Sequence, residues 1–429
     1  MRIRNWIKGS VLLTAMALVV AACATTTEEP AATTEGPAPA TPTTKAAEEP
    51  AAATTEAPKE DIKIGLLTSL TATFAPWGVS VADGMRMAVE EINAAGGANG
   101  HKLVLVEADT QSNAEEAVKA LERMVEDGVV AAGGPISSDV GLNTSIAAEE
   151  LQVPLFLVKA GSGAILTRDS RYTFRTCLPA APMTMGPIRQ WADQNGATKI
   201  GAIIADYGWG RAIEAALLSS FEGSDIEVQI EVAPIGETDF TTYLRSLNEF
   251  GPEMIAVTGH PPGAGAITVQ SADLGFDVPV AGAWFPLSLI MGGGAAEAAV
   301  DRFADFGCAD YDSESYQDLA RRYLAFSDNV FMEDDAVAGY GIVTMVADAI
   351  ANVGPDPVAI AEYLHGQSYN LPGYAFEMAW TEWGELAKAQ PTFVIMRATG
   401  APEGVNDAGD WWPELLIHSD PLKPYVPEG

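Results

Sequence analysis

A strict alternation of strand-like and helix-like segments constrains the fold of this chain more than any other feature of its sequence. Residues 61–70 and 101–110 are apolar runs typical of buried strands, whereas residues 80–97 and 112–128 carry apolar side chains every three or four positions, as a helix with one buried face does. Strands and helices in strict turn predict βαβ units, in which helices cover both faces of a parallel sheet.

The alternation starts again after residue 178, which predicts a second unit of the same kind. Residues 198–208, 226–235 and 253–260 have the pattern of strands, and helical patterns separate them. We therefore expect an α/β fold with two Rossmann-like lobes, each a doubly wound parallel sheet, joined by a hinge. The expected boundaries are residues 61–178 plus about 309–370 for lobe I, and about 179–308 plus 371–429 for lobe II.

Two such lobes predict a binding site between them. Ligands of open parallel sheets bind at the carboxyl ends of the strands. Two sheets that face each other at those ends enclose a cleft that a hinge can close. We therefore expect a small molecule to bind in the cleft.

At Cys23 the sequence changes from an apolar run to a segment of Thr, Glu, Ala and Pro, and this change predicts how the chain is held outside the cytoplasm. A positively charged start precedes an apolar run at 11–22, which is too short to span a bilayer comfortably. Residues 1–22 are therefore expected to be a signal peptide, and residues 20–23, VAAC, resemble a bacterial lipobox, which implies that Cys23 is lipidated. The alternative is a soluble secretory signal with an incidental cysteine.

The lipidated Cys23 and residues 24–60, which are rich in Thr, Ala, Glu and Pro, are expected to form a disordered tether, because that composition cannot bury a core. Asp and Glu outnumber Lys and Arg by 58 to 24, a net charge of −34. This charge argues against nucleic acid as a partner and leaves the lipid anchor as the only expected membrane contact. Cys177 and Cys308 remain beyond the tether, and the sequence leaves open whether they pair.

The sequence lacks the motifs that catalysis and metal binding require. Its four histidines form no H-E-x-x-H motif, no cysteine pair has zinc spacing, and no G-K-[ST] closes a phosphate loop. The segment GWGRAI at 208–213 begins like a dinucleotide-binding motif, but Ile213 replaces its third glycine. We therefore predict no catalytic residue, no metal and no cofactor, and expect a binding protein rather than an enzyme.

Seven segments of the chain resemble the leucine/isoleucine/valine-binding proteins and follow that family's order. They are IKIGLLTSLTATFAPWGVSVADGMRMAVEEINAAGG, VVAAGGPISSDVG, VPLFLVKAGSGAILT, YTFRTC, ADYGWGR, TDFTTYLRSL and VPVAGAWF. The family comprises the extracytoplasmic receptors of ABC importers for branched-chain amino acids. The resemblance covers about residues 61–400 and implies the type I periplasmic binding protein fold.

The resemblance also implies that a serine hydroxyl after a G-P-x-S turn binds the ligand carboxylate. That serine is Ser138 here, with Ser137 beside it. A hydroxyl and free N–H groups at the start of a helix form an anion site. The alternative is that both serines only cap the following helix.

The next contact of the family is a loop that usually reads Ala-Thr and offers backbone N–H groups and a hydroxyl. Here the loop reads Lys159, Ala160, Gly161 and Ser162, so the N–H groups of Ala160 and Gly161 are the expected donors and the hydroxyl is missing or displaced to Ser162. Lys159 is unusual at this place. It either neutralises an acidic ligand or lies solvated on the rim.

Aromatic side chains complete the expected site. Trp77 stands where the family places an aromatic ring over the ligand, and Trp209 stands where the second lobe usually supplies a tyrosine. Trp284 follows a strand of the second lobe, and His260 stands where the family often has a tyrosine. The alternative for each tryptophan is a place in the core.

One departure from the family bears on the ligand. Amino-acid binders of this family hold the ligand ammonium with an acidic residue of the second lobe, and near that position the sequence has Trp284 and no Asp or Glu. An α-ammonium without a counter-charge is costly to bury, which favours an aromatic or aliphatic carboxylate or a neutral amide. The ligand class therefore stays open among amino acid, amide and small carboxylate.

The resemblance implies a monomeric, lipid-anchored receptor that binds a small molecule outside the cytoplasm and delivers it to an ABC permease. The alternative is a ligand-binding sensor module of the same fold that acts on a signalling partner.

Overall fold

The computed structural model describes residues 59–428, apart from residues 259–262, 283–284 and 293. Several predictions concern positions outside the described residues. They are the signal peptide (1–22), the lipidation of Cys23, the tether up to residue 58, and the roles of His260 and Trp284.

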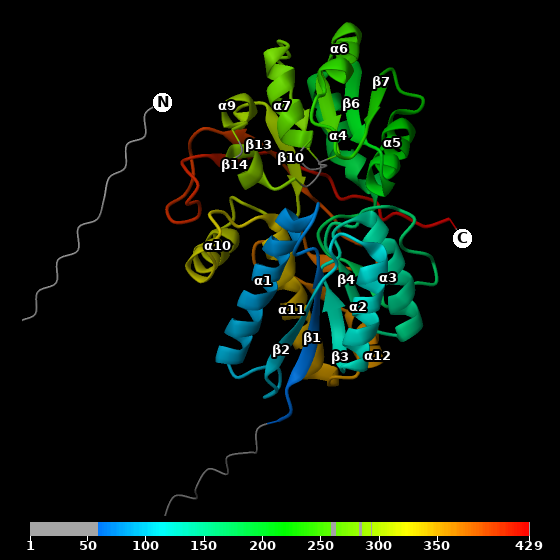
Figure 1. The fold of residues 1–429 in the computed structure, drawn as a ribbon, viewed down its shortest axis with the longest axis vertical. Helices are drawn as coiled ribbons and strands as arrows, with labels where there is room; N and C mark the ends of the chain where they lie inside the picture. Colours follow the sequence, from blue (N-terminus) through cyan, green and yellow to red (C-terminus); the bar gives the residue numbers. More distant parts are fainter. Residues whose placement is uncertain (1–58, 259–262, 283–284, 293, 429) are drawn as a thin grey trace, which may run out of the picture. The chain divides into compact units, whose positions relative to one another are not determined.

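The first lobe is built on a five-stranded parallel sheet with the order β2-β1-β3-β4-β5. Its strands are β1 (Ile62–Thr68), β2 (Leu103–Asp109), β3 (Val129–Gly133), β4 (Leu155–Leu157) and β5 (Thr173–Arg175). Figure 1 shows helix α1 (Ala75–Ala94) on one face, with α2 (Ala114–Glu126) and α3 (Ser138–Leu151) on the other. Every residue of β3 and β4 is buried, as expected for a sheet covered on both faces.

Local sequence explains where the helices of this lobe begin. The side chain of Asn113 accepts a hydrogen bond from Glu116 N at 3.1 Å and so caps α2. Helix α1 begins at Ala75, five residues before the segment that its apolar pattern predicts, with Pro76 in its first turn. Proline is favoured there because its missing N–H group would have no intrahelical acceptor.

The second lobe is built on a seven-stranded sheet with the order β14-β13-β10-β9-β8-β6-β7. Five strands are parallel: β6 (Lys199–Ala205), β7 (Glu227–Ala233), β8 (Met254–Val257), β9 (Val280–Ala281) and β10 (Phe303–Gly307). The helices of this lobe are α4 (Ala181–Asn195), α5 (Gly208–Phe221), α6 (Thr241–Phe250), α7 (Gly263–Asp273), α8 (Leu287–Gly292) and α9 (Ala296–Ala299). The predicted α/β fold with two doubly wound lobes is confirmed.

An antiparallel edge of this sheet was not evident from the sequence. Strand β13 (Thr392–Arg397) pairs antiparallel with β10, and β14 (Trp412–His418) pairs antiparallel with β13. The chain re-enters the lobe at the carboxyl end of β10, where Gly307 pairs with Thr392. Strand β13 therefore runs back along β10 in the opposite direction.

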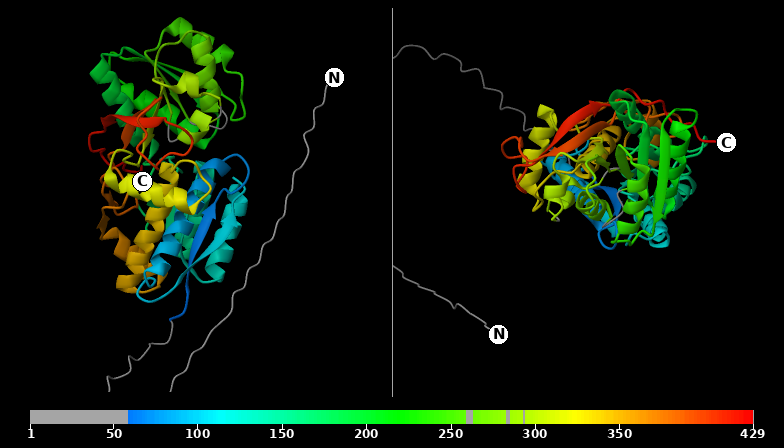
Figure 2. Two further views of the ribbon diagram at one scale, coloured as in Figure 1. Left: turned by 90° about the vertical axis from the view of Figure 1, so that its left-hand side faces the viewer. Right: turned by 90° about the horizontal axis from the view of Figure 1, so that it is seen from above.

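Between β10 and β13 the chain returns to the first lobe. Helices α10 (Glu314–Phe326), α11 (Asp334–Val353) and α12 (Pro357–His365) lie beside the blue and cyan elements in Figure 1. The short strands β11 (Ser368–Tyr369) and β12 (Met378–Ala379) follow. Trp380 packs edge-on against Phe174 of β5, with ring centroids 5.2 Å apart, so residues just after 371, which the sequence pattern assigned to the second lobe, contact the first. The red segment that carries β14 lies beside the yellow α10 segment in Figure 2, where Trp412 Nε1 donates to Asp312 at 3.2 Å.

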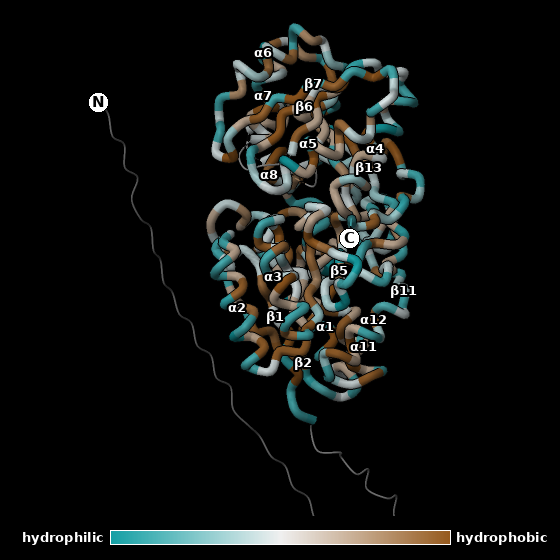
Figure 3. Tube along the Cα trace, turned by 90° about the vertical axis from the view of Figure 1, so that its right-hand side faces the viewer, coloured by the Kyte–Doolittle hydropathy of each residue, from teal (hydrophilic) through white to brown (hydrophobic). Residues whose placement is uncertain are grey.

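Helix α11 is long and apolar enough to cross a membrane by length and composition, but 67% of its most apolar window is buried. It packs against α1 so closely that a Cβ atom added at Gly84 would lie 2.1 Å from Ala336 O. In Figure 3, which colours hydrophobic residues brown, the buried strands β1 and β6 are mostly brown. Helix α11 is therefore a core helix of the first lobe.

A disulfide bond joins two of the segments through which the chain passes between the lobes. Cys177 follows β5 in the first crossing, and Cys308 follows β10 in the second; their Cα atoms are 5.2 Å apart. The third crossing precedes β13. Asp334 Oδ2 lies 3.4 Å from Cys177 Sγ, but the two sulfur atoms are bonded to each other and so do not form a metal site with it. The disulfide answers the pairing question that the sequence left open.

Candidate functional site

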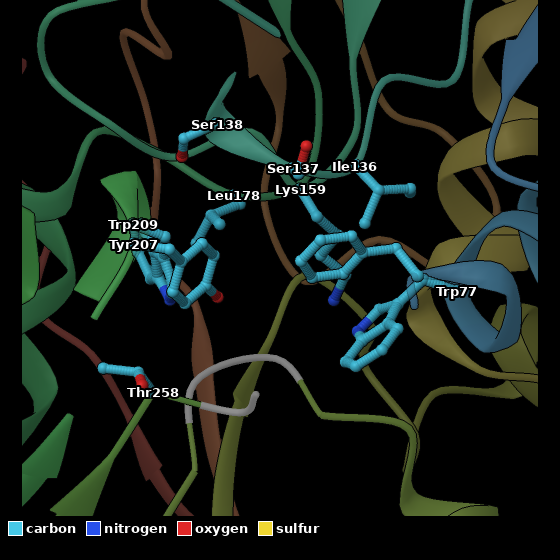
Figure 4. A pocket seen from close by; sticks show the side chains of 10 residues that line it. Trp77, Ile136, Ser137, Ser138, Lys159, Leu178, Tyr207, Trp209 and Thr258 are labelled. Atoms are coloured by element: carbon cyan, nitrogen blue, oxygen red, sulfur yellow. The ribbon is translucent and has the colours of Figure 1, made fainter. Parts of the chain in front are cut away.

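Ten described residues from both lobes line one cavity of about 30 Å³ (Figure 4). They are Phe74, Trp77, Ile136, Ser137, Ser138, Lys159, Leu178, Tyr207, Trp209 and Thr258. A cavity of this size holds about one or two water molecules. The space between the lobes is therefore smaller than an amino acid, and the lobes or the lining rings would have to move to admit a solute of that size.

Sheet topology explains why these residues meet. In each lobe the first five strands have the order 2-1-3-4-5, so the connections leave in opposite directions on either side of the first strand. Such a reversal opens a crevice at the carboxyl ends of the strands. Trp77 and Ser137 follow β1 and β3 at the reversal in the first lobe, and Tyr207 and Thr258 follow β6 and β8 at the reversal in the second.

Aromatic rings from the two lobes face each other across this cavity. Figure 4 shows Trp77 on one side and Tyr207 with Trp209 on the other. The ring of Trp77 meets Phe285 of the second lobe edge-on at a centroid distance of 5.4 Å, and Phe74 lies 6.0 Å from Tyr207. Trp77 and Trp209 are buried, and both also line the cavity. A place in the core and a place in the cleft are therefore not alternatives for these two residues.

The two serines at the start of α3 have different contacts. Ser137 Oγ accepts a hydrogen bond from Val140 N at 3.3 Å, which makes Ser137 the N-cap of the helix. Ser138 Oγ accepts from Ser162 N at 3.1 Å and so joins the start of α3 to the next predicted loop. Ser137 therefore caps the helix, which was the alternative to ligand contact. Ser138 instead links two predicted parts of the site.

The predicted loop of residues 159–162 lies against Trp209. A Cβ atom added at Gly161 would lie 2.2 Å from Cζ3 of the Trp209 ring, so the indole of the second lobe rests directly on the loop of the first. Within the described part of the chain, the N–H groups of Ala160 and Gly161 have no acceptor. Ala160 is 1% exposed. Buried N–H groups without acceptors are rare. Ala160 and Gly161 adjoin the cavity-lining Lys159, but neither of them lines the cavity itself.

Lys159 is buried and paired, so a solvated position on the rim is wrong. Its Nζ donates to both carboxylate oxygens of Asp334, at 2.8 and 2.9 Å, and lies 3.7 Å from Asp335 Oδ1. Burial lowers the pKa of Lys159, but the attraction of the two carboxylates raises that pKa by a larger amount. The pKa of Lys159 therefore lies above its usual value. The charge of Lys159 is thus already matched by residues of the chain.

The sequence did not reveal the carboxyl groups that surround Lys159. Asp305 of β10 accepts from Phe285 N at 2.7 Å and from Phe306 N at 2.8 Å, and it lies near enough to Lys159 for their charges to interact. Burial raises the pKa of Asp305 well above its usual range. An aspartate within an apolar, strand-like run, FADFG, is the sequence feature from which this buried carboxyl group could have been predicted.

Glu333 is a second buried carboxyl group, and it bridges the lobes. It precedes α11 of the first lobe and accepts hydrogen bonds from Leu287 N at 3.0 Å and Ser288 N at 2.9 Å in the second lobe. Burial raises the pKa of Glu333 to about 7. This contact explains the position of α8 beside the hinge.

Five cavity-lining residues were not predicted individually. They are Phe74, Ile136, Leu178, Tyr207 and Thr258. All five lie within a few residues of a predicted position or a strand end. Their meeting in one cavity depends on how the two lobes approach each other, which no local pattern records.

Comparisons with known proteins show to which family this chain is similar. A family model described as "Periplasmic binding protein" matches residues 61–400. Leu/Ile/Val-binding protein homolog 2 of Brucella abortus is 29% identical over 307 residues, which cover 70% of this chain and 81% of that protein.

Solved structures show the same fold. A leucine binding protein LivK from Thermotoga maritima has a TM-score of 0.71 at 20% identity, covering 84% of this chain and 99% of its own. A solute binding protein of an ABC transporter from R. palustris, in complex with benzoate, has a TM-score of 0.72 at 17% identity, covering 86% and 98%. At these identities the likeness shows the fold alone.

Proposed function

Because the chain belongs to the periplasmic binding protein family, we propose that it is the monomeric, lipid-anchored solute receptor of an ABC importer. It binds a small molecule between its lobes and delivers that molecule to a permease. Similarity to Leu/Ile/Val-binding proteins supports this assignment. The predicted lipid on Cys23 would keep the receptor near the membrane, since two or more acyl chains anchor a protein stably.

The observation that supports solute binding most directly is the joint origin of the cavity wall. Its residues follow strand ends at the point of reversal in both sheets, and rings from the two lobes approach one another across it. A solute in this place contacts both lobes only when they are closed. Binding therefore shifts the balance toward the closed state in proportion to the contacts that the solute makes there.

The polar groups of the site favour a solute with a carboxylate. The start of α3 and the free N–H groups of Ala160 and Gly161 are all donors, and the positive end of a helix attracts an anion. Trp77 and Trp209 supply apolar, planar surface for the rest of the solute. Asp305 of the second lobe does not line the cavity, and its carboxylate accepts from Phe285 N and Phe306 N, so the proposed solute classes are amino acid, amide and small carboxylate.

A thermal-shift panel tests this function. The panel comprises branched-chain and aromatic amino acids, their amides, and aliphatic and aromatic carboxylates, benzoate included. A ligand at a hundredfold excess over its Kd stabilises the protein by about 2.7 kcal/mol, which gives a clear shift in Tm. Stabilisation by none of these classes would contradict the proposal.

Membrane fractionation tests the lipid anchor separately. We expect the full chain to sediment with membranes and the Cys23→Ser variant to appear in the soluble fraction. Sedimentation of Cys23→Ser with membranes would favour a different mode of attachment. Binding in the thermal-shift panel is expected to be the same for both proteins, since residue 23 lies outside the matched residues 61–400.

A further inference from the structure

Every carbonyl oxygen from Ala160 to Ser162 in the predicted ligand loop has a donor. The guanidinium of Arg175 donates to Ala160 O through Nη1 and to Ser162 O through Nη2, the latter at 2.7 Å. The remaining carbonyl, Gly161 O, accepts from Ala181 N at 2.8 Å. Ser162 O also accepts from Ile165 N at 3.3 Å, so Arg175 provides two of the four hydrogen bonds that hold these carbonyls.

The direction of these carbonyls determines the direction of the N–H groups. In a trans peptide unit the C=O and the following N–H point to opposite sides. Because Arg175 binds Ala160 O, the N–H of Gly161 points away from the guanidinium. The next unit shows the same rule: Ala181 holds Gly161 O, and the N–H of Ser162 donates on the other side to Ser138 Oγ.

Arg175 is wholly buried and is paired with one carboxylate. Its side chain is 0% exposed, and its Nε donates to Glu385 Oε2 at 2.9 Å, with Glu385 itself 1% exposed. Glu385 belongs to the third crossing between the lobes and also accepts from Ala180 N of the first crossing at 3.4 Å. The arginine thus connects the ligand loop to two of the crossings that form the hinge.

Stability alone does not account for such a pair. Replacing a buried ion pair by apolar side chains of similar volume is often neutral or stabilising, because two desolvated charges are costly. An apolar pair, however, cannot donate to two carbonyl oxygens at once. The rigid fork of the guanidinium can do so, and a lysine ammonium cannot reproduce that geometry.

We propose that Arg175 is a positioning residue for solute binding: it orients the loop of residues 159–162 so that the Gly161 N–H is presented to the solute, and Glu385 ties that loop to the hinge. This inference rests on the proposed function, because it assigns the donor to a bound solute. Arg175 is wholly buried and does not line the cavity, so it acts through the loop.

The test compares a double variant with a matched control. Arg175→Met with Glu385→Leu removes both charges and both carbonyl contacts. Arg302→Met is the control, because Arg302 of the second lobe also donates to backbone carbonyls, Thr268 O at 3.3 Å and Ala298 O at 3.2 Å, but does not line the cavity. Urea denaturation first establishes that each variant is folded.

Hydrogen–deuterium exchange of the ligand-free protein gives the first readout. We expect the amides of residues 158–162 to exchange at least tenfold faster in the double variant and at the wild-type rate in Arg302→Met. Unchanged exchange of this loop in a folded double variant would overturn the proposal.

Calorimetric titration with L-leucine and with benzoate gives the second readout. For whichever probe the wild type binds, we expect the Kd to rise at least tenfold in the double variant and to stay within twofold in Arg302→Met. Wild-type affinity in the double variant would overturn the proposal. If the wild type binds neither probe, the proposed ligand classes are weakened, and the exchange comparison still decides the role of Arg175.

Arg175→Lys keeps the proposal open to refutation if the double variant does not fold. Lysine preserves the charge opposite Glu385 but cannot hold Ala160 O and Ser162 O together. Faster loop exchange and a raised Kd in Arg175→Lys would support positioning. Wild-type exchange and affinity in this variant would overturn it.

Discussion

The substitution Gly161→Ala should act as a wedge between the lobes. Gly161 belongs to the first lobe, and the ring of Trp209 from the second lobe rests on it in this structure. An added Cβ would lie 2.2 Å from Trp209 Cζ3 and 2.8 Å from Cε3. Real Cβ contacts are essentially never that short, so closure requires the indole to move away from the loop.

The cost of this movement can be bounded. Adding one methyl group to a well-packed site typically costs about 1–3 kcal/mol. When the lobes part, Trp209 is expected to move away from Gly161, so that part of the cost should fall on closure and on ligand affinity rather than on the fold of the first lobe. The expected rise in Kd is therefore roughly 5- to 150-fold, since each 1.4 kcal/mol is tenfold in affinity. A part of the strain remains in the open state, because Leu178 Cδ2 would lie 2.7 Å from the new atom.

The assay is titration calorimetry with the ligand identified by the thermal-shift panel, together with small-angle scattering of the liganded protein. The control is Gly265→Ala in α7, where the nearest atom to an added Cβ, Ile290 Cδ1, is 3.8 Å away. We expect weakened binding and a larger radius of gyration for Gly161→Ala at ligand concentrations that close the wild type. Wild-type affinity in Gly161→Ala would refute the reasoning.

Three further predictions concern the disulfide, a buried carboxyl group and the aromatic wall. The double variant Cys177→Ser with Cys308→Ser should lose about 2–5 kcal/mol of unfolding free energy, because the disulfide closes a loop with a sequence separation of 131; an unchanged urea midpoint would contradict this. Burial raises the pKa of Glu333 from 4.5 to about 7, so its contribution favours the fold at low pH and is lost as the pH rises through that range. Relative to Glu333→Gln, the wild type should therefore lose up to about 3 kcal/mol of unfolding free energy between about pH 5 and pH 8, at 1.36 kcal/mol per pKa unit. Parallel pH profiles of the two proteins in urea denaturation would exclude the effect. Replacing Trp77 or Trp209 by Phe should reduce the ligand-induced change in tryptophan fluorescence and weaken binding, whereas Trp383→Phe, outside the cavity lining, should leave the affinity unchanged; equal behaviour of all three variants would count against the cleft assignment.

Much of the site could be predicted because the resemblance to the leucine/isoleucine/valine-binding proteins marks residues that follow strand ends. Trp77, Ser138 and Trp209 each follow an apolar run of strand length, and parallel strands present their carboxyl ends at one edge. The structure brings all three to one cavity. Ligand contact by these residues remains a prediction that the binding experiments decide.

Lys159 shows where sequence reasoning reached its limit. Its partner Asp334 lies 175 positions away and reads in the sequence as an ordinary acidic residue in the first turn of a helix. Arg175 and Glu385 are 210 positions apart and equally unremarkable by composition. Side chains that pair across such distances leave no periodic pattern, since the pairing depends on how whole elements pack.

The sequence by itself determined the two α/β lobes, because apolar periodicity follows directly from the geometry of buried strands and helices. Tertiary structure alone decided the antiparallel edge of the second sheet, the disulfide between two crossings, the neutralised lysine and the arginine behind the ligand loop. Each of these arises where segments distant in the chain meet at the hinge, and the energy of such a meeting depends on burial and distance rather than on neighbouring residues.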